Sequence, residues 1–323
     1  MSENTGWTIG IDIGGTFVKY GLVKGGRVAG ERSFSTSRFS SPRQLQDRLV
    51  LAARELIGGH RGVAGVGIGI PGLVKYPEGI VKTCVNIPGW KNVPLRRLLQ
   101  KRLHVPVQVE NDVNVMTLAE WRYGAGRGAD DLLCMTLGTG VGGGLVLNGR
   151  FYRGWGGTAG EVGHMPLQMD GIRCACGGRG CLERYVGNRE IIAWVRQQIR
   201  QGRQSILIRL TGGRPSGITP EIIDAACAKG DRLARETWER VGTHIGTTLA
   251  GVVNLLSPEK IVIGGGISKA GKWLFEPIRR TVRERVMRGV QPVSIVPALL
   301  GGSAGIIGAG LLIREWLDSQ RNA

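Results

Sequence analysis

Long apolar runs are missing from this chain, and none of its hydrophobic segments is long and uncharged enough to span a bilayer. The first seven residues lack a basic region followed by an apolar one, so we expect no signal peptide, no membrane partner and a cytoplasmic location. Cysteine is scarce, with six residues, and nothing in the sequence indicates the oxidising compartment that a disulfide framework needs.

Acidic residues are outnumbered: 43 Lys and Arg stand against 25 Asp and Glu, which gives a formal net charge of +18. Such a charge can favour nucleic acid or anionic substrates. Here the basic residues are scattered, and aromatic residues do not interleave with them as they do on a base-stacking surface. The pattern favours solvated faces, and we expect no nucleic-acid partner.

The 323 residues, of which 42% are hydrophobic, predict about two domains. In the first part we predict three strands within 7–35, a helix from Ser41-Pro42, a strand over 63–70, a helix from Pro94, a strand over 105–109 and a helix that stops at Gly124. The three-strand pattern returns at 132–137, 142–147 and 150–153, followed by helices near 220–229, 231–256, 271–288 and 303–317 and by strands over 260–263 and 293–296. The repeat predicts two related α/β domains, and ligands of such pairs lie in the cleft between them.

Two glycine-rich turns between apolar strands carry the first functional signal. Their sequences are Ile9-Gly-Ile-Asp-Ile-Gly-Gly-Thr16 and Met135-Thr-Leu-Gly-Thr-Gly-Val-Gly-Gly-Gly144. Either one alone is typical of an ordinary tight turn, and neither matches the Gly-x-x-x-x-Gly-Lys-Ser/Thr phosphate loop. As a facing pair they would hold a polyphosphate with backbone N–H groups, which favours a nucleotide-dependent phosphoryl transferase. Asp12 ends a buried strand, where a lone carboxylate is costly, and beside phosphates it would bind Mg²⁺.

His164, Cys174, Cys176 and Cys181 form the sharpest spacing in the chain, His-x₉-Cys-x-Cys-x₄-Cys. Three thiolates and one imidazole complete a tetrahedral zinc shell, and glycines between the last two cysteines let the chain wrap tightly. Since four protein ligands close the site, we predict a structural zinc ion that does not generate hydroxide.

Two acidic residues flank the predicted zinc site. Glu161 lies three residues before His164, and Glu183 lies two after Cys181. Each alone is typical of an exposed charge. Around a rigid metal loop, however, the two carboxylates favour the binding of a polyhydroxy compound.

Asn111-Asp112 follows the strand predicted over 105–109. Asp112 either caps the next helix or takes the proton of a substrate hydroxyl, because strand ends that face a cleft are where catalytic groups lie in α/β folds. The segment alone leaves both interpretations open.

Over nearly its whole length the chain resembles the ROK family of sugar kinases and repressors, within the superfamily of actin, sugar kinases and heat-shock ATPases. The resemblance depends on Asp12-Ile-Gly-Gly-Thr16, Gly67-Ile-Gly-Ile-Pro71-Gly72, Asn86-Ile-Pro88-Gly89-Trp90, Glu110-Asn111-Asp112, Leu137-Gly-Thr-Gly-Val-Gly-Gly-Gly144, Glu161-Val-Gly-His164, Cys174-Ala-Cys-Gly-Gly-Arg-Gly-Cys181-Leu-Glu183 and Ile263-Gly-Gly-Gly-Ile267. It implies an α/β fold of two actin-like (ribonuclease H-like) domains with a cleft between them. We expect residues 1–118, joined by the helix near 303–323, to form one domain, and residues 119–302 to form the other.

The resemblance also implies the ligands: ATP with Mg²⁺, and a hexose. By matching motif, Asp112 would be the general base on the sugar 6-hydroxyl, and His164 would bind zinc through one ring nitrogen and offer its other N–H to the sugar. The residues implied in sugar binding are Gly72, Asn86, Asn111, Asp112, Glu161, His164 and Glu183. The residues implied in ATP binding are Asp12, Gly14, Gly15, Thr16, Lys19, Gly138, Thr139, Gly140, Gly264, Gly265 and Gly266.

Of the three places where the sequence departs from the usual family pattern, Ser303 is expected to affect packing, and the other two bear on which sugar fits. Bulky residues follow Asp112, and Arg184-Tyr-Val-Gly-Asn188 stands where a small Ala-Ser-Gly run is common. We expect glucokinase activity, because the motifs at residues 110–112 and 161–164 look more like those of glucose kinases. Kinases of N-acetylmannosamine, mannose, fructose or allose are the alternatives. A sugar-responsive repressor is disfavoured, because eleven residues before Asp12 are too few for a helix-turn-helix, and a homo-oligomer (dimer or tetramer) is expected.

Overall fold

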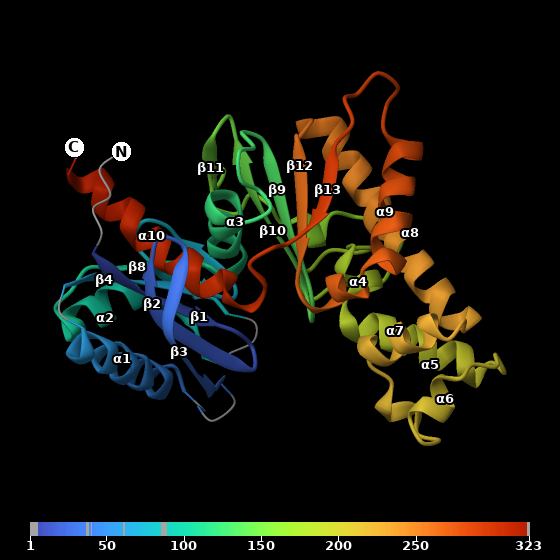
Figure 1. The fold of residues 1–323 in the computed structure, drawn as a ribbon, viewed down its shortest axis with the longest axis horizontal. Helices are drawn as coiled ribbons and strands as arrows, with labels where there is room; N and C mark the ends of the chain where they lie inside the picture. Colours follow the sequence, from blue (N-terminus) through green and yellow to red (C-terminus); the bar gives the residue numbers. More distant parts are fainter. Residues whose placement is uncertain (1–5, 37–38, 40, 61, 85–88, 322–323) are drawn as a thin grey trace. The chain divides into compact units, whose positions relative to one another are not determined.

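Three antiparallel strands open the chain, and two parallel strands complete the same five-stranded sheet (Figure 1). The computed structural model describes residues 6–36, 39, 41–60, 62–84 and 89–321. The sheet order is β3-β2-β1-β4-β8, made of β1 (Trp7–Ile13), β2 (Phe17–Lys24), β3 (Arg27–Ser35), β4 (Val63–Ile70) and β8 (Val107–Asn111). The predicted meander and both predicted parallel strands are confirmed.

A second sheet repeats this order as β11-β10-β9-β12-β13. Its strands are β9 (Leu132–Leu137), β10 (Val141–Leu147), β11 (Arg150–Tyr152), β12 (Lys260–Gly264) and β13 (Ser294–Pro297). The hairpin between β10 and β11 turns at Asn148 and Gly149, which both have positive φ, at 52° and 65°, as a type I′ turn requires. The repeated strand order confirms two related α/β halves.

The chain divides into two compact units. The first comprises residues 1–128, 144–159 and 299–323, and the second comprises residues 129–143 and 160–298. The first unit also holds a small antiparallel sheet that the sequence did not predict, made of β5 (Leu73–Lys75), β6 (Ile80–Thr83) and β7 (Lys91–Val93). Strands of three or four residues are too short to show a period-two pattern.

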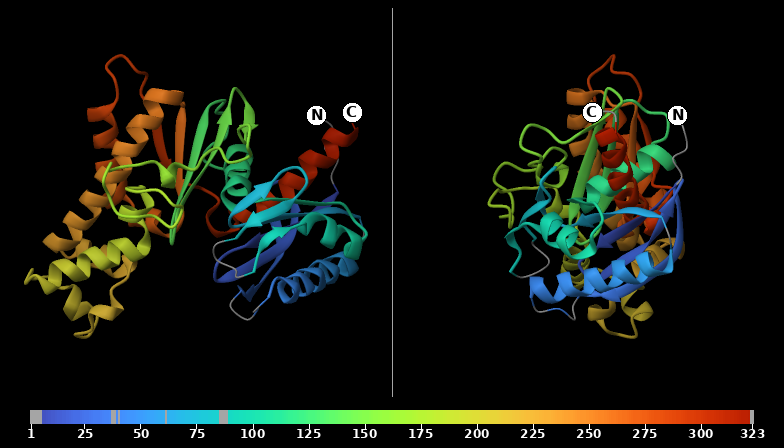
Figure 2. Two further views of the ribbon diagram at one scale, coloured as in Figure 1. Left: turned by 180° about the vertical axis from the view of Figure 1, so that it is seen from behind. Right: turned by 90° about the vertical axis from the view of Figure 1, so that its left-hand side faces the viewer.

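Helices cover both faces of the first sheet (Figures 1 and 2). They are α1 (Pro42–Gly59), α2 (Leu95–Leu103), α3 (Asp112–Tyr123) and α10 (Ala304–Arg321). On one face, fully buried Ile9 and Ile68 belong to the same apolar core as Leu49 of α1. On the other face α10 comes so close that a Cβ at Gly67 would lie 1.7 Å from the backbone oxygen of Ala309. The glycines that alternate with isoleucine and valine in β4 therefore admit α10.

The start of α1 follows the predicted capping chemistry. The Ser41 hydroxyl accepts the Gln44 N–H at 3.4 Å, and Pro42 takes the first helical position. The predicted apolar face of this helix, with Leu45 and Leu49, is fully buried. The sequence signal and the packing agree at this helix.

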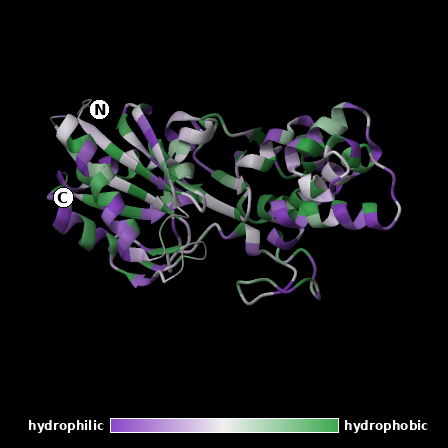
Figure 3. Cartoon of the chain, turned by 90° about the horizontal axis from the view of Figure 1, so that it is seen from below, coloured by the Kyte–Doolittle hydropathy of each residue, from purple (hydrophilic) through white to green (hydrophobic). Residues whose placement is uncertain are grey.

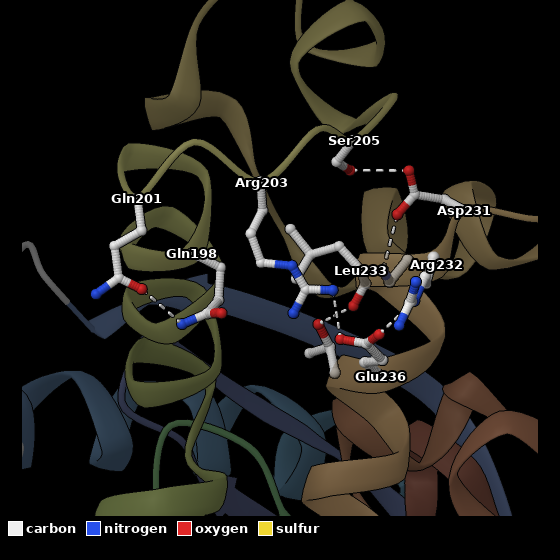
Figure 4. A network of polar contacts seen from close by, with 10 residues as sticks. Gln198, Gln201, Arg203, Ser205, Asp231, Arg232, Leu233 and Glu236 are labelled. Carbon is white, nitrogen blue, oxygen red and sulfur yellow. Dashed lines mark hydrogen bonds and ion pairs between the residues drawn. The ribbon is translucent and has the colours of Figure 1, made fainter.

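Outside β9, the start of β10, β12 and β13, the second unit is mostly helical. Its helices are α4 (Glu183–Val186), α5 (Asn188–Arg200), α6 (Leu207–Leu210), α7 (Pro220–Ala228), α8 (Arg232–Leu256) and α9 (Lys272–Arg285). Asp231 caps α8 and accepts the Ser205 hydroxyl at 2.9 Å (Figure 4). It also accepts the Ile206 N–H at 2.8 Å. An ion pair of Arg203 with Glu236, at 2.6 Å, adds to this network, which fixes the segment after α5 on α8 (Figure 4).

Hydrophilic and hydrophobic residues alternate along the helices of both units, as expected of helices that bury one face (Figure 3). In the part of the chain that the structure describes, no helix has both the length and the apolar character needed to cross a bilayer.

Candidate functional site

Asp12 lies near the end of β1, beside the beginning of α10. A Cβ at Gly305 would lie 2.3 Å from the Asp12 carboxyl carbon, so glycine at this position makes room for the carboxylate. Burial, and to a lesser extent the nearby Asp112, raise the pKa of Asp12 from its ordinary 3.8 to about 7, against the opposing effect of Lys19, its partner on β2. A carboxylate in such surroundings favours a proton or a metal cation as its counter-charge.

Asn111 and Asp112 lie where β8 ends and α3 begins. The N-cap of α3 is Asn111, whose side-chain oxygen accepts the N–H groups of Val113 and Asn114 at 2.9 and 3.1 Å. Its side-chain amide donates to the Gly72 backbone oxygen at 3.0 Å. Asp112 is the first helical residue, and its carboxylate accepts the Val113 N–H at 3.0 Å. The helix cap that the sequence left open for Asp112 is therefore made by its neighbour.

Sequence reasoning gave no role to Glu110, which is 2% exposed on β8. Its carboxylate accepts the Asn111 N–H at 2.8 Å, the Asn114 side-chain amide at 3.1 Å and the Arg153 Nε at 2.6 Å. The Arg153 guanidinium also stacks on the Tyr76 ring, 3.9 Å from its centroid. A carboxylate in a buried strand signals that a partner must exist, but the partner lies 43 residues away and carries no sequence mark.

The first glycine turn, residues 14–16, follows Asp12 directly. The Gly14 N–H donates to the Phe17 oxygen, and its own oxygen accepts the Thr36 hydroxyl, both at 2.9 Å. Gly15 and Thr16 are exposed. Lys19 Nζ donates to the Gly302 oxygen at 3.2 Å.

The first unit thus carries the predicted groups Asp12, Gly14, Gly15, Thr16, Lys19, Gly72, Asn111 and Asp112. Asp12, the predicted metal ligand, interacts electrostatically with Asp112, the predicted base. Asn111, a predicted sugar ligand, is hydrogen-bonded to Gly72, another one. Asn86, also predicted to bind the sugar, lies outside the described residues.

The second glycine turn, residues 138–140, connects β9 to β10 in the second unit. Within the turn, the Gly138 N–H donates to the Gly140 oxygen at 3.0 Å, and the last two residues are exposed. Gly264 pairs with Thr136 across β12 and β9, so residues 264–266 leave their strand beside this turn. The turn predicted to bind phosphate and the segment predicted to bind adenosine therefore follow two adjacent strands, β9 and β12.

His164, Cys174, Cys176 and Cys181 converge, with all four ligand atoms within 4.8 Å of one another. The Sγ atoms of Cys176 and Cys181 are 3.6 Å apart, and His164 Nδ1 is 3.7 Å from the Sγ of Cys174. A tetrahedral zinc ion places two sulfur ligands about 3.8 Å apart and a sulfur and a nitrogen ligand about 3.5 Å apart. The described cluster therefore fits a zinc ion.

Ionisation of all three thiols would require a cation beside them. A hydrogen bond from the Gly178 N–H lowers the pKa of Cys176, whereas burial raises the pKa of Cys181 to about 12. Three sulfurs this close ionise together when a metal balances their charge. The donor set is closed and therefore suits a structural zinc ion.

The two carboxylates that flank the cysteine loop, which we define as residues 164–181, have different partners. Glu161 Oε2 lies 3.9 Å from Nε2 of His164, the ring nitrogen that faces away from the cysteines. Burial raises the pKa of Glu161, His164 lowers it, and Glu183 raises it. Glu183 Oε2 instead accepts the Val141 N–H at 2.9 Å, directly after the second glycine turn.

Two mixed sheets of the same strand order define a two-domain α/β protein of the actin-like kind, and known proteins agree. A family model described as "ROK family" matches residues 8–316. The glucokinase of Thermotoga maritima is 36% identical over 95% of this chain and 97% of its own length, and that of Streptomyces coelicolor is 34% identical over 96% and 98%. A ROK family glucokinase from Streptomyces griseus, solved with glucose and AMPPNP, is 35% identical with a TM-score of 0.84 over 96% of this chain and all of its own.

The chain therefore belongs to the ROK family.

Proposed function

We propose that this ROK sugar kinase transfers the γ-phosphoryl group of ATP to the 6-hydroxyl of D-glucose. The observation that carries the proposal is the placement of Asp112 directly after β8, beside Asp12 and next to Asn111, the N-cap of α3. Full-length similarity to glucokinases supports glucose as the substrate.

Asp112 is the proposed general base. Its position as the first residue of α3, with one carboxylate oxygen on the Val113 N–H, fixes the side chain without a flexible loop. In in-line phosphoryl transfer such a carboxylate orients the attacking hydroxyl and accepts its proton. Asn111, which is held by Gly72, and Glu110, which is held by Arg153, would orient the sugar side of this site.

Asp12 and Lys19 are the proposed partners of the nucleotide phosphates, together with the two glycine turns. Mg²⁺, when bound, would supply the positive charge that neutralises the transferring phosphoryl group. Burial is the main cause of the raised pKa of Asp12, and a buried carboxylate beside a second one suits a role toward a cation.

On the second unit, Glu161, His164 and Glu183 are the proposed sugar ligands. Zinc on Nδ1 of His164 would leave Nε2 as the nitrogen that donates to a hydroxyl. Residues 138–140 and 264–266 would contact phosphate and adenosine. The division into domains 1–118 and 119–302 and the homo-oligomer also stay proposals.

Asp112→Asn tests the base. The amide keeps the size of the side chain and an oxygen for the Val113 N–H, so sugar binding and folding should persist. Turnover should fall on the order of 10²–10⁴-fold, the usual contribution of a general base. The matched control is Asp47→Asn, a carboxylate in an exposed ion pair with Arg102. If the Asp112 variant stayed within tenfold of wild type, Asp112 would not be the base.

A further inference from the structure

The segment of residues 183–188 lies against the second glycine turn. The Asn188 N–H donates to the Gly138 oxygen at 3.0 Å, and the Glu183 carboxylate accepts the Val141 N–H at 2.9 Å. A Cβ at Gly140 would lie 2.7 Å from Glu183 Oε2, so only glycine lets the carboxylate approach this closely. Both ends of the turn are therefore hydrogen-bonded to this segment.

The same segment follows the cysteine loop in the chain and is hydrogen-bonded to it. The Arg184 N–H donates to the oxygen of Cys181, a predicted zinc ligand, at 2.9 Å. The Tyr185 hydroxyl donates to the Gln168 side-chain oxygen at 2.9 Å and accepts the Ile172 N–H at 3.2 Å, and this side chain is 5% exposed. Small residues are common at positions 184–188 in the family pattern, whereas this chain has Tyr185, whose large side chain lies on the cysteine loop.

We infer that residues 183–188 position the second glycine turn for the nucleotide and couple it to zinc in the cysteine loop. The inference rests on the proposed kinase function. A glycine turn has few conformational restraints of its own. Contacts from a segment anchored by a metal restrict the turn before the nucleotide arrives, and such preorganisation strengthens binding. Zinc then increases the affinity for ATP, in addition to positioning the neighbouring residues that bind the sugar.

Asn188 offers a selective test because it is the first residue of α5. Proline is favoured at this helical position, and the preceding Gly187 has φ −66° and ψ 154°, a conformation that proline accepts in its neighbour. Asn188→Pro therefore removes the N–H bound to Gly138 and leaves the helix intact. Asn188→Ala is the matched control, since it removes the same side chain but keeps the N–H.

The measurements are the Kd for AMPPNP with Mg²⁺, the Kd for glucose, and zinc content. We expect Asn188→Pro to raise the AMPPNP Kd about tenfold, the effect of one lost hydrogen bond plus the displaced turn. Asn188→Ala should stay within about twofold of wild type, and glucose affinity and zinc content should match in both variants. Equal AMPPNP affinity in the two variants would overturn the inference alone. A wild type that binds no AMPPNP would overturn the kinase function as well.

Zinc removal tests the coupling directly. Wild-type protein stripped with a chelator, then freed of it, should bind AMPPNP several-fold more weakly, and added Zn²⁺ should restore the affinity. Circular dichroism checks that the stripped protein keeps its fold. An unchanged AMPPNP Kd in folded, zinc-free protein would overturn the coupling. If the stripped protein unfolds, the comparison of Asn188→Pro with Asn188→Ala decides whether the inference holds.

Discussion

Replacing Asp12 by Asn should change how stability depends on pH. A carboxyl group with a folded-state pKa near 7 and an ordinary value of 3.8 binds its proton more tightly in the folded state. Its contribution to stability is therefore complete below about pH 4 and is lost as the pH rises through 7. Asparagine is neutral throughout, so Asp12→Asn should remove this loss.

The size of the effect follows from the pKa difference. The step from 3.8 to about 7, at about 1.4 kcal/mol per pKa unit, corresponds to about 4 kcal/mol as an upper limit. Because even buried sites in proteins behave as a medium with an effective dielectric constant of about 20, the expected value is lower, about 2 kcal/mol. At pH 8 and without Mg²⁺, Asp12→Asn should thus be more stable than wild type by about this amount, and the difference should shrink steadily as the pH falls and vanish below about pH 4.

The assay is denaturant unfolding of wild type and variant between pH 5 and 8 in Mg²⁺-free buffer. The difference in unfolding free energy between the two proteins cancels pH effects that they share, such as those of the cysteine cluster. Mg²⁺ with ATP should then stabilise wild type and leave the variant unchanged. A difference that stays constant with pH would refute the account of Asp12.

Three further changes have defined outcomes. Cys176→Ser should release zinc, lower the Tm and raise the KM for glucose, and metal analysis should find about one zinc per wild-type chain and less in the variant. Arg153→Ala should lower the unfolding free energy by about 3 kcal/mol, because it leaves the Glu110 carboxylate buried without its ion pair; Arg153→Ala combined with Glu110→Gln should recover part of this loss in the same denaturation assay. Tyr185→Phe loses the hydroxyl that holds the cysteine loop, so zinc transfer to a chromogenic chelator should be several-fold faster, and a rate equal to wild type would contradict that role.

Local chemistry explains which parts of the fold were predictable. Ser41-Pro42 starts α1 through a side-chain cap and a fixed φ, both of which are encoded within four residues. The Asn148-Gly149 hairpin and the cysteine spacing are equally local. Asp112 remained ambiguous in the sequence, because Asn and Asp cap helices equally well and only the structure shows which of the two does so.

The unpredicted parts depend on distant partners. The bond between Glu183 and the Val141 N–H joins residues 42 apart, and the Glu110–Arg153 ion pair joins residues 43 apart. Neither pair shows a periodic pattern or a spacing rule. A carboxylate in a buried strand indicates that a hydrogen-bonding or charged partner is needed, but only tertiary packing decides which residue is that partner.

Sugar-dependent ADP formation by wild-type protein with Mg²⁺ and ATP tests the central claim most directly. The panel comprises glucose, mannose, fructose, allose, N-acetylmannosamine and N-acetylglucosamine. We predict the highest kcat/KM for glucose, with glucose 6-phosphate as the product. A higher kcat/KM for N-acetylmannosamine than for glucose would show that N-acetylmannosamine is the preferred substrate. No ADP formation with any sugar would contradict the kinase assignment.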